Sequence, residues 1–569
     1  MNQGDFVMRK LAGAVALCLG SSLVLISVAR GQARGGGAWS TAGGDEQLTG
    51  WQKSESQLTR DTLKDMKFLW KIKLGSQQVT EPTEPLFGGH TITNNGFKDI
   101  AVVLGPENTL TSVDFEMGTV LWQRQVTPPS HGGVPCPSGQ FASFVIQPAP
   151  SFGFGRGRGR GAAGRGAAGR GAAPPPPPPA PPAPQAPRVG AAGGGFGGIR
   201  GIFVVTPDGQ AHEQLLTNGW DYGTPVKFLA PDSNMSFPTV HDSVMYVNTS
   251  GSCGGAPNGV FSLDMSTAEY QKASYKSGDV GVTGTDGGAL STDGKTIYVM
   301  TGSGATAGDA HPNSVLALDA KTLELKDYYT PPGGAATAKA GINVSPVVFS
   351  YKGKDFVAAY VAGGRLALLD AASLGGANHH TPIAITPALS KNGGVGAWGR
   401  LATAEDANGT RFIYISVNGP FPADLKLPAG NGATPNGAVV AYKVDENAGK
   451  VSLSPAWVSP DVVNPSPASI VMNTAPETPA GFGAAAPAPA QTPAVKAGGI
   501  VFVLAEGEPG KSNARLYGFD AETGAQLYSS ADQIASAANQ ASISISGGHV
   551  LFVTADNTLY AFGVEYLRD

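Results

Sequence analysis

Apolar residues recur along the chain in a short phrase that reads apolar, any residue, small, apolar, Asp. Each copy follows an apolar run after a short loop, so each unit contains at least two predicted strands. Five copies end in Asp, at Asp114, Asp264, Asp319, Asp370 and Asp520, and two similar copies end at Lys443 and Gly563. The apolar runs cover residues 100–104, 245–247, 297–300, 356–361, 412–417, 500–504 and 550–553. Repetition at about 40–50 residues is typical of a β-propeller.

The phrase fits a strand that is buried on both faces. Alternate residues of a strand face opposite sides, and a propeller blade has a neighbour on each side. The third residue of the phrase is small in every copy except the one that contains Leu368, so the next blade can approach closely. The final Asp opens a tight turn by accepting backbone N–H groups, and a Gly such as Gly524 then takes positive φ.

We count eight units, of which seven carry the phrase. The eighth is degenerate: it runs through residues 140–145 and 202–209 and has Leu215 at the position of the Asp. The last unit, residues 543–563, supplies only three strands, while an unpaired apolar segment at 68–74 precedes the first unit. We therefore predict an all-β, eight-bladed β-propeller over residues 51–569, in which 68–74 pairs with 558–563 and closes the ring.

One segment carries a family resemblance. Residues 114–122, Asp-Phe-Glu-Met-Gly-Thr-Val-Leu-Trp, resemble the Asp-x-x-Thr-Gly-x-x-x-Trp docking repeat of pyrroloquinoline quinone (PQQ) propellers, the quinoprotein alcohol dehydrogenase-like superfamily. Residues 58–70 resemble the lead-in of those enzymes, and the phrases at 253–258 and 373–376 look like features of bacterial PQQ-like repeat proteins. The resemblance covers about residues 51–569 and implies the fold more strongly than the chemistry.

The N-terminus predicts export. Arg9 and Lys10 precede an apolar stretch at 11–28 and a small-residue ending, which together indicate a secretory signal over residues 1–33, cleaved after Ala29 or Ala33. An uncleaved anchor is the alternative. Leu17 stands before Cys18 where a lipoprotein signal needs a small residue, so we expect no lipid anchor. The predicted location is periplasmic or secreted, without membrane attachment after cleavage.

Three segments lack the apolar residues needed to fold. We expect a flexible segment at 34–50 and disordered insertions at 155–198, which is rich in Gly, Arg and Pro, and at 474–498, which is rich in Ala and Pro. The formal net charge of −4 gives no argument for nucleic acid, and we expect no such partner.

Both insertions fall between the first and second strands of their units, and these loops emerge on one face of a propeller. The opposite face, called the long-loop face below, carries the second-to-third loops and the connections between blades. Its predicted loops cover residues 251–258, 302–313, 418–437 and 506–513. We expect an unidentified small-molecule or protein ligand to bind there, and we expect a monomer.

The resemblance implies a PQQ cofactor in the central funnel, held with Ca²⁺ and served by an Asp general base and a disulfide between adjacent cysteines. This chain has no Cys-Cys pair and no Cys-x-x-Cys-His haem motif. Trp220-Asp221-Tyr222 echoes a phrase of those enzymes, but it lies in the degenerate unit. His379 and His380 have no third ligand in view. We assign no catalytic and no metal residue, and PQQ with Ca²⁺ rests on the resemblance alone.

Residues just before each innermost strand would point toward the axis. This rule gives six candidate ligand-binding residues, Asp286, Asn343, Trp398, Arg400, Asn464 and Gln540. Their aromatic, guanidinium and amide groups suit a planar or sugar-like ligand, or alternatively fill and hydrate the channel. Cys136 and Cys253 lie on loops of neighbouring units on the long-loop face, where a disulfide or two free thiols are both compatible with the sequence.

The function predicted from the sequence is an exported PQQ-like propeller that acts as a binding or scaffold protein. A PQQ-dependent alcohol or sugar dehydrogenase is one alternative. An envelope-assembly or partner-recognition propeller is another.

Overall fold

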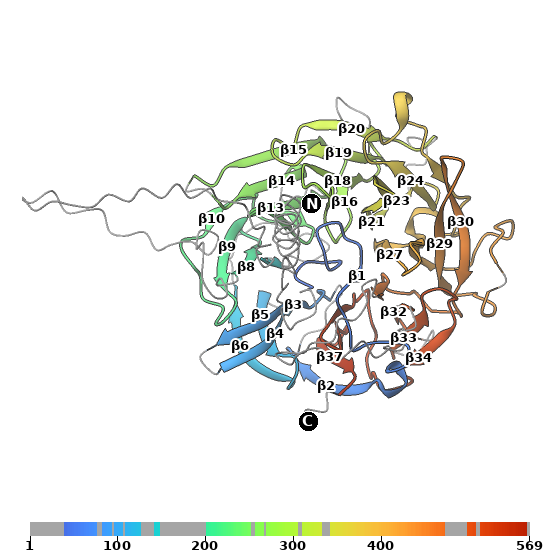
Figure 1. Ribbon diagram of the computed structural model, residues 1–569. Coiled ribbons are helices and arrows are strands. Elements are labelled where there is room, and N and C mark those ends of the chain that lie inside the picture. Colours follow the sequence, from blue (N-terminus) through green and yellow to red (C-terminus); the bar gives the residue numbers. More distant parts are fainter. Residues whose placement is uncertain are drawn as a thin grey trace, which may run out of the picture. The chain divides into compact units, whose positions relative to one another are not determined.

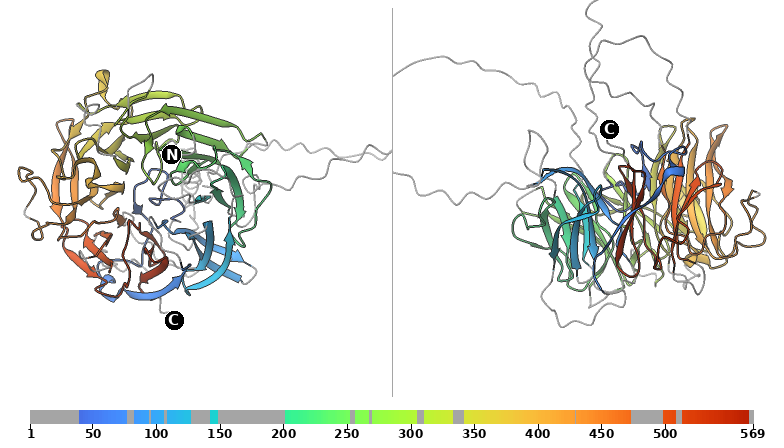
Figure 2. Two further views of the ribbon diagram at one scale, coloured as in Figure 1. Left: turned by 180° about the vertical axis from the view of Figure 1, so that it is seen from behind. Right: turned by 90° about the horizontal axis from the view of Figure 1, so that it is seen from below.

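Eight β-sheets are arranged as blades around a common axis, as the repeat predicts (Figure 1). The computed structural model describes residues 39–76, 82–93, 96–105, 108–126, 142–147, 201–251, 256–266, 269–304, 310–332, 342–428, 430–472, 498–507 and 513–565, all within one compact unit. The edge-on view in Figure 2 shows the strands of every blade running between the two faces of the ring. The predicted eight-bladed, all-β fold is therefore confirmed.

The strands of each blade are given from the axis outward. Blade 1 holds β3 (Leu86–Thr93), β4 (Gly96–Gly105), β5 (Thr109–Asp114) and β6 (Thr119–Gln125). Blade 2 holds β7 (Ser143–Ile146), β8 (Gly201–Val205), β9 (Gln210–Leu215) and β10 (Val226–Lys227). Blade 3 holds β11 (Asn234–Met235), β12 (Thr239–His241), β13 (Val244–Ser250), β14 (Asn258–Asp264) and β15 (Lys272–Gly278). Blade 4 holds β16 (Val282–Thr283), β17 (Ala289–Leu290), β18 (Thr296–Thr301), β19 (Val315–Asp319) and β20 (Leu325–Tyr329).

The other four blades follow the same order. Blade 5 holds β22 (Val347–Tyr351), β23 (Lys354–Val361), β24 (Arg365–Asp370) and β25 (Ala384–Ile385). Blade 6 holds β27 (Ala402–Glu405), β28 (Arg411–Asn418), β29 (Gly437–Asn447) and β30 (Lys450–Val458). Blade 7 holds β31 (Ser469–Val471), β32 (Ile500–Ala505), β33 (Arg515–Asp520) and β34 (Gln526–Ser529). Blade 8 holds β35 (Ser544–Ser546), β36 (His549–Val553), β37 (Thr558–Gly563) and the N-terminal β2 (Lys67–Lys73).

Short elements complete the chain. The strand β1 (Trp51–Gln52) pairs in parallel with β31, and β21 (Asn343–Ser345) pairs in parallel with β26 (Trp398–Arg400). The helices of the described residues are single 3-10 turns, η1 (Leu63–Asp65), η4 (Gly376–Asn378) and η5 (Gly393–Gly396). None of the helices in this part of the chain is long and apolar enough to cross a membrane.

The N-terminal strand closes the ring as predicted. β2 pairs antiparallel with β37, from Lys67 opposite Gly563 to Lys73 opposite Thr558. This pairing gives the last blade its fourth strand and removes two free sheet edges. The two insertions also fall where the sequence places them, between β7 and β8 and between β31 and β32. Residues 155–198 and 474–497 themselves lie outside the described residues.

One hydrogen-bonded contact recurs between five pairs of neighbouring blades in the described residues. The residue that follows the third strand of a blade accepts a hydrogen bond from an aromatic side chain of the preceding blade. The tryptophan donors are Trp70 to Phe115 O (2.9 Å), Trp122 to Leu216 O (3.0 Å) and Trp457 to Ala521 O (2.9 Å). The tyrosine donors are Tyr246 to Ala320 O (2.8 Å), Tyr298 to Ala371 O (2.9 Å) and Tyr414 to Ala521 O (3.2 Å). Leu216 follows Leu215, so the degenerate blade keeps the contact without the Asp.

A glycine in the turn gives each docking tryptophan its space. Gly524 has φ of 72°, and a Cβ atom there would lie 2.4 Å from Cε3 of Trp457. Asp520 holds the same turn, because its Oδ1 accepts the N–H groups of Glu522 and Thr523, both at 2.9 Å. The docking repeat that suggested the family resemblance thus has a direct structural role.

Residues 39–52, called the axial strap below, run inside the ring and contact every blade (Figure 1). Its carbonyl oxygens accept backbone N–H groups of Phe87, Ile146, Leu290, Val348, Thr403 and Ile470, in blades 1, 2, 4, 5, 6 and 7. Its side chains donate to Pro238 O, before β12, and to Ile545 O, in β35. The sequence predicts a flexible segment over 34–50. Residues 39–50 of that range are instead packed against the ring, with Trp39 and Leu48 buried.

Candidate functional site at the axis

The guanidinium group of Arg400 lies at the axis between two carboxylates from other blades. Its Nη1 is 2.7 Å from Oε2 of Glu84 and 2.7 Å from Oδ2 of Asp286. All three side chains are buried, with exposed fractions of 0% for Arg400, 1% for Glu84 and 3% for Asp286. Nη2 donates to Ser469 Oγ at 3.4 Å. The cluster therefore joins blades 1, 4, 6 and 7 through charged groups that have no access to water.

Local structure brings these groups together. Glu84 lies two residues before β3, and Asp286 lies on the short connection between β16 and β17. Arg400 ends β26, and the parallel register places it opposite Ser345 of β21. Each residue thus stands at the start of an innermost strand, where the side chain can reach the axis.

The axial strap covers the cluster. Trp39 Nε1 donates to Oε1 of Glu84 at 2.5 Å, and the backbone N–H of Gly43 donates to the same oxygen at 3.3 Å. The indole ring of Trp39 lies 5.9 Å from the Arg400 guanidinium carbon, a cation–π distance. The strap and the cluster consequently form one network.

Burial and the neighbouring charges shift the pKa values of Glu84 and Arg400. Desolvation raises the pKa of Glu84 to about 7, and the attraction of Arg400 only partly offsets it, while Asp286 adds to the rise. Burial acts in the opposite sense on Arg400, but Glu84 and Asp286 outweigh it and hold the pKa of Arg400 above its ordinary value. Arg400 therefore stays charged, and Glu84 is the group that titrates near neutral pH.

The structure brings some of the six predicted residues together. Asp286 and Arg400 form an ion pair, and Asn343 lies opposite Trp398 in the β21–β26 pair. Asn343 Oδ1 accepts the N–H of Gly284 at 3.1 Å. The indole Nε1 of Trp398 is buried and has no hydrogen-bond partner among the described residues.

The remaining two predicted residues, Asn464 and Gln540, join neither of these pairs within the described ranges. Asn464 and Gln540 take left-handed backbone conformations, with φ of 42° and 61°, and neither is a hydrogen-bond or ion-pair partner of Arg400 within the described ranges. Glu84 is the partner that the sequence missed. It stands two residues before the first blade's innermost strand, so the same rule would have found it had it been applied to that blade. Cys136 and Cys253 lie outside the described residues.

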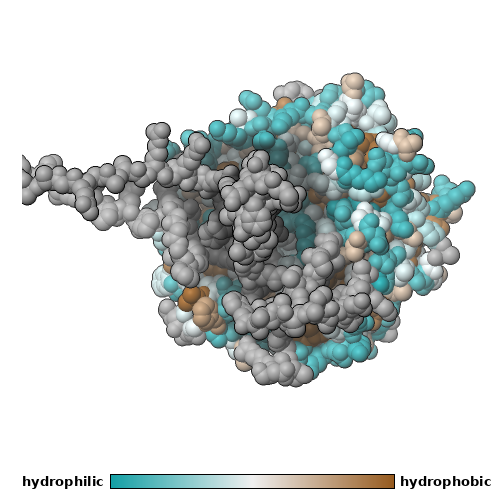
Figure 3. Space-filling model, in the orientation of Figure 1, coloured by the Kyte–Doolittle hydropathy of each residue, from teal (hydrophilic) through white to brown (hydrophobic). Residues whose placement is uncertain are grey.

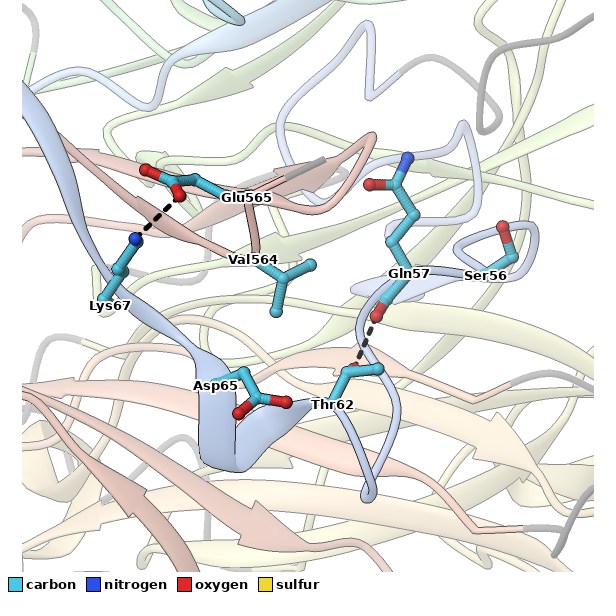
Figure 4. Close-up of a pocket in the computed structure, with 7 residues that line it drawn as sticks. All are labelled: Ser56, Gln57, Thr62, Asp65, Lys67, Val564 and Glu565. Carbon is cyan, nitrogen blue, oxygen red and sulfur yellow. Dashed lines mark hydrogen bonds and ion pairs between the residues drawn. The ribbon is translucent and has the colours of Figure 1, made fainter. Parts of the chain in front are cut away.

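Two cavities have linings that do not include the residues of the Arg400 cluster. One, of about 490 Å³, is lined by residues that precede β2 and follow β37, namely Ser56, Gln57, Thr62, Asp65, Lys67, Val564 and Glu565. Figure 4 shows Lys67 and Glu565 facing each other there, 2.8 Å apart. The other, of about 330 Å³, lies between blades 3 and 4 on the long-loop face. Its lining is polar and small, with Ser250, Gly251, Asn258, Asp279, Gly281, Thr283, Gly302 and Ser303.

No family model matches the sequence, and no curated protein matches it. Solved structures do match. A quinohemoprotein alcohol dehydrogenase from Comamonas testosteroni is 12% identical with a TM-score of 0.51, over 94% of this chain and 81% of that chain. A europium-containing methanol dehydrogenase is 12% identical with a TM-score of 0.53, over 93% and 98%. The fold is that of the quinoprotein dehydrogenases. BamB from Moraxella catarrhalis is 11% identical with a TM-score of 0.40, over 89% and 98%.

The axis does not fit the quinone and Ca²⁺ of a quinoprotein dehydrogenase. Its two carboxylates are already bonded to Arg400, and the fixed positive charge of a buried guanidinium opposes a divalent cation beside it. The axial strap also occupies the space above the cluster. No group of three or more His, Cys, Asp or Glu side chains suited to a metal occurs within the described ranges.

The Trp220-Asp221-Tyr222 phrase lies on the turn between β9 and β10, remote from the innermost strands. Trp220 is 60% exposed and stacks on the guanidinium of Arg124 at 4.0 Å. Asp221 bonds to the side chain of His212 at 3.3 Å and to Gln214 at 3.0 Å. Burial alone raises the pKa of Asp221, but these hydrogen bonds outweigh it and lower the pKa below its usual value. Asp221 is therefore a weak base on the outer part of a blade.

The His379-His380 pair takes part in packing. The His379 ring stacks on Tyr328 with centroids 4.1 Å apart, and His311 stacks on Tyr328 at 3.9 Å. Nδ1 of His379 is 2.9 Å from Asp327. His380 is exposed beside it. These contacts account for His379 without a metal ion.

Proposed function

We propose that the protein is an exported binding or scaffold propeller that does not catalyse PQQ-dependent oxidation. The observation that carries this proposal is the position of Arg400, which neutralises both axial carboxylates beneath the axial strap. Export is supported by the charged, apolar and small-residue pattern of residues 1–33, which lie outside the described residues. The fold alone does not argue for dehydrogenase chemistry, because one fold supports many functions.

The long-loop face supports the binding role. Its cavity between blades 3 and 4 presents the hydroxyl groups of Ser250, Thr283 and Ser303 and the carboxylate of Asp279. The opposite face of the ring, which Figure 3 draws, is also mainly hydrophilic over blades 5 to 7. A polar ligand or a protein partner with a polar surface suits such groups better than an apolar ligand.

The test is to add PQQ and Ca²⁺ to the purified mature protein. We expect no saturable quinone absorbance, no rise in melting temperature and no dye reduction with alcohols or aldose sugars. PQQ alone and Ca²⁺ alone serve as controls. Stoichiometric quinone binding together with turnover would show that the protein is a dehydrogenase and would overturn the proposal.

A further inference from the structure

The inner wall of the ring recognises the axial strap mainly through the backbone. Six ring amides donate to strap carbonyls at 2.7–3.1 Å. The pairs are Phe87 with Trp39, Ile146 with Ser40, Leu290 with Glu46, Val348 with Gln47, Thr403 with Thr49 and Ile470 with Gly50. The strap is not extended, because Gly44 N–H donates to Thr41 O and Leu48 N–H donates to Asp45 O, both at 3.0 Å, and close two turns. Main-chain hydrogen bonds can hold such a peptide, with a few side chains adding specificity.

Trp39 is the side chain that anchors the strap. It is 1% exposed, donates to Glu84 at 2.5 Å and lies beside the Arg400 guanidinium. A buried tryptophan at the centre of a contact surface is a typical dominant residue in peptide and protein recognition.

Glycine lets the strap approach the wall closely. Gly50 has φ of 63°, and a Cβ atom there would lie 2.9 Å from Ala468 O and 3.0 Å from Cβ of Ala402. Gly43 has φ of 72°, and a Cβ atom there would meet the Arg400 side chain at 3.0 Å. These two bends make the fit selective for a peptide with glycine at both positions.

We propose that the inner wall of the ring is a binding site for a peptide that contains turns and that the axial strap is its resident ligand in cis. The strap leaves the site as a unit while the blades stay folded, and a peptide of the same sequence then binds in its place. This site lies at the axis, whereas the ligand-binding role proposed above is placed on the long-loop face.

Hydrogen exchange of the full-length protein tests the release of the strap. We expect the amides of Phe87, Ile146, Leu290, Val348, Thr403 and Ile470 to exchange with similar rates, at least about tenfold faster than amides bonded within the centres of blades, because local opening is less costly than global unfolding. Equal rates for the two groups of amides would mean that the strap opens only when the ring unfolds, which would overturn the proposal.

Two matched variants test the site itself. Trp39→Ala removes the anchor, whereas Trp220→Ala removes an exposed tryptophan of blade 2. A labelled peptide of residues 39–52 should bind saturably to Trp39→Ala and not to Trp220→Ala or the wild type, and the same peptide with Gly50→Val should fail to bind. Faster exchange of the six amides in Trp39→Ala without peptide binding would overturn the proposal. If Trp39→Ala does not fold, hydrogen exchange of the wild-type protein still tests whether the strap leaves the ring before the ring unfolds.

Discussion

Between neighbouring blades, a tryptophan or tyrosine donates one hydrogen bond to a carbonyl at the end of the next blade's third strand. At the axis, by contrast, a charged network of Arg400, Glu84 and Asp286 joins distant blades and the axial strap. The docking contacts are repeated, local and largely independent of one another. The axial contacts occur once and share their partners, so the loss of one group affects all the others.

This difference has a consequence for stability. A docking residue can be lost at the cost of its own hydrogen bond and packing, because the donor and the acceptor carbonyl are both uncharged. A buried charge that loses its partner keeps its full desolvation penalty. We therefore expect substitutions at the axis to be costly and those at the blade interfaces to be moderate.

The largest effect is expected for Arg400→Met at pH 8. The substitution leaves the buried carboxylates of Glu84 and Asp286 without a cation, so the free energy of unfolding should fall by about 3–5 kcal/mol. Arg515→Met is the control, because Arg515 pairs with Asp532 on the surface, with exposed fractions of 34% and 74%, and should cost less than about 1 kcal/mol. Urea unfolding measures both. Similar values for the two variants would show that the axial pair does not stabilise the ring.

The second effect depends on pH. Because burial raises the pKa of Glu84 from 4.5 to about 7 in the folded protein, the folded state binds more protons than the unfolded state between these values. The resulting stability is fully present below pH 4.5 and is lost as the pH rises through 7, by up to about 3 kcal/mol. Glu84→Gln should lack this loss. A difference in unfolding free energy between wild type and variant that stays constant from pH 5 to 8 would contradict the assignment.

The third effect concerns a docking tryptophan. Trp457→Phe keeps an aromatic ring on Gly524 but removes the hydrogen bond to Ala521 O. That carbonyl still accepts from Tyr414, so the loss should be only about 1–2 kcal/mol. A loss as large as that of Arg400→Met would mean that substitutions at the blade interfaces cost as much as those at the axis.

The smallest effect is expected for Tyr246→Phe, which removes one hydroxyl and its 2.8 Å bond to Ala320 O. Thermal and urea unfolding should show a loss of about 0.5–1.5 kcal/mol. In the double variant with Trp457→Phe, the two losses of unfolding free energy should add to within about 0.5 kcal/mol, because the two contacts belong to different pairs of blades. Strong coupling between them would contradict the independence of the docking contacts.

The fold could be predicted in detail because the same physical demand recurs in each blade. A strand covered on both sides needs apolar residues and a small one at the contact, and the turn after it needs Asp or Gly. Even the degenerate blade was recognisable from residues 140–145 and 202–209, although Leu215 stands where the phrase has Asp. The missing last strand and the spare segment before blade 1 then determined how the ring closes.

The axis was harder to predict because its contacts do not repeat. The axial strap is rich in Gly, Ser and Thr, which favours a flexible segment, yet its backbone carbonyls make most of the bonds to the ring. A sequence pattern describes side chains, so it does not predict hydrogen bonds made by the backbone. Asp286 and Arg400 were found from their place before an innermost strand, but nothing in the sequence paired them or showed that Trp39 would cover them.

The contact between Trp39 and Glu84 gives the most direct test of the axial network. Trp39→Phe removes the indole donor, Glu84→Met removes the acceptor oxygens, and the double variant completes a thermodynamic cycle for the 2.5 Å bond. Urea unfolding of the four proteins at pH 8 should give a coupling free energy of at least about 1 kcal/mol, as residues in direct contact do. Additive effects within about 0.3 kcal/mol would contradict the claim that the strap is bound to the axial charges.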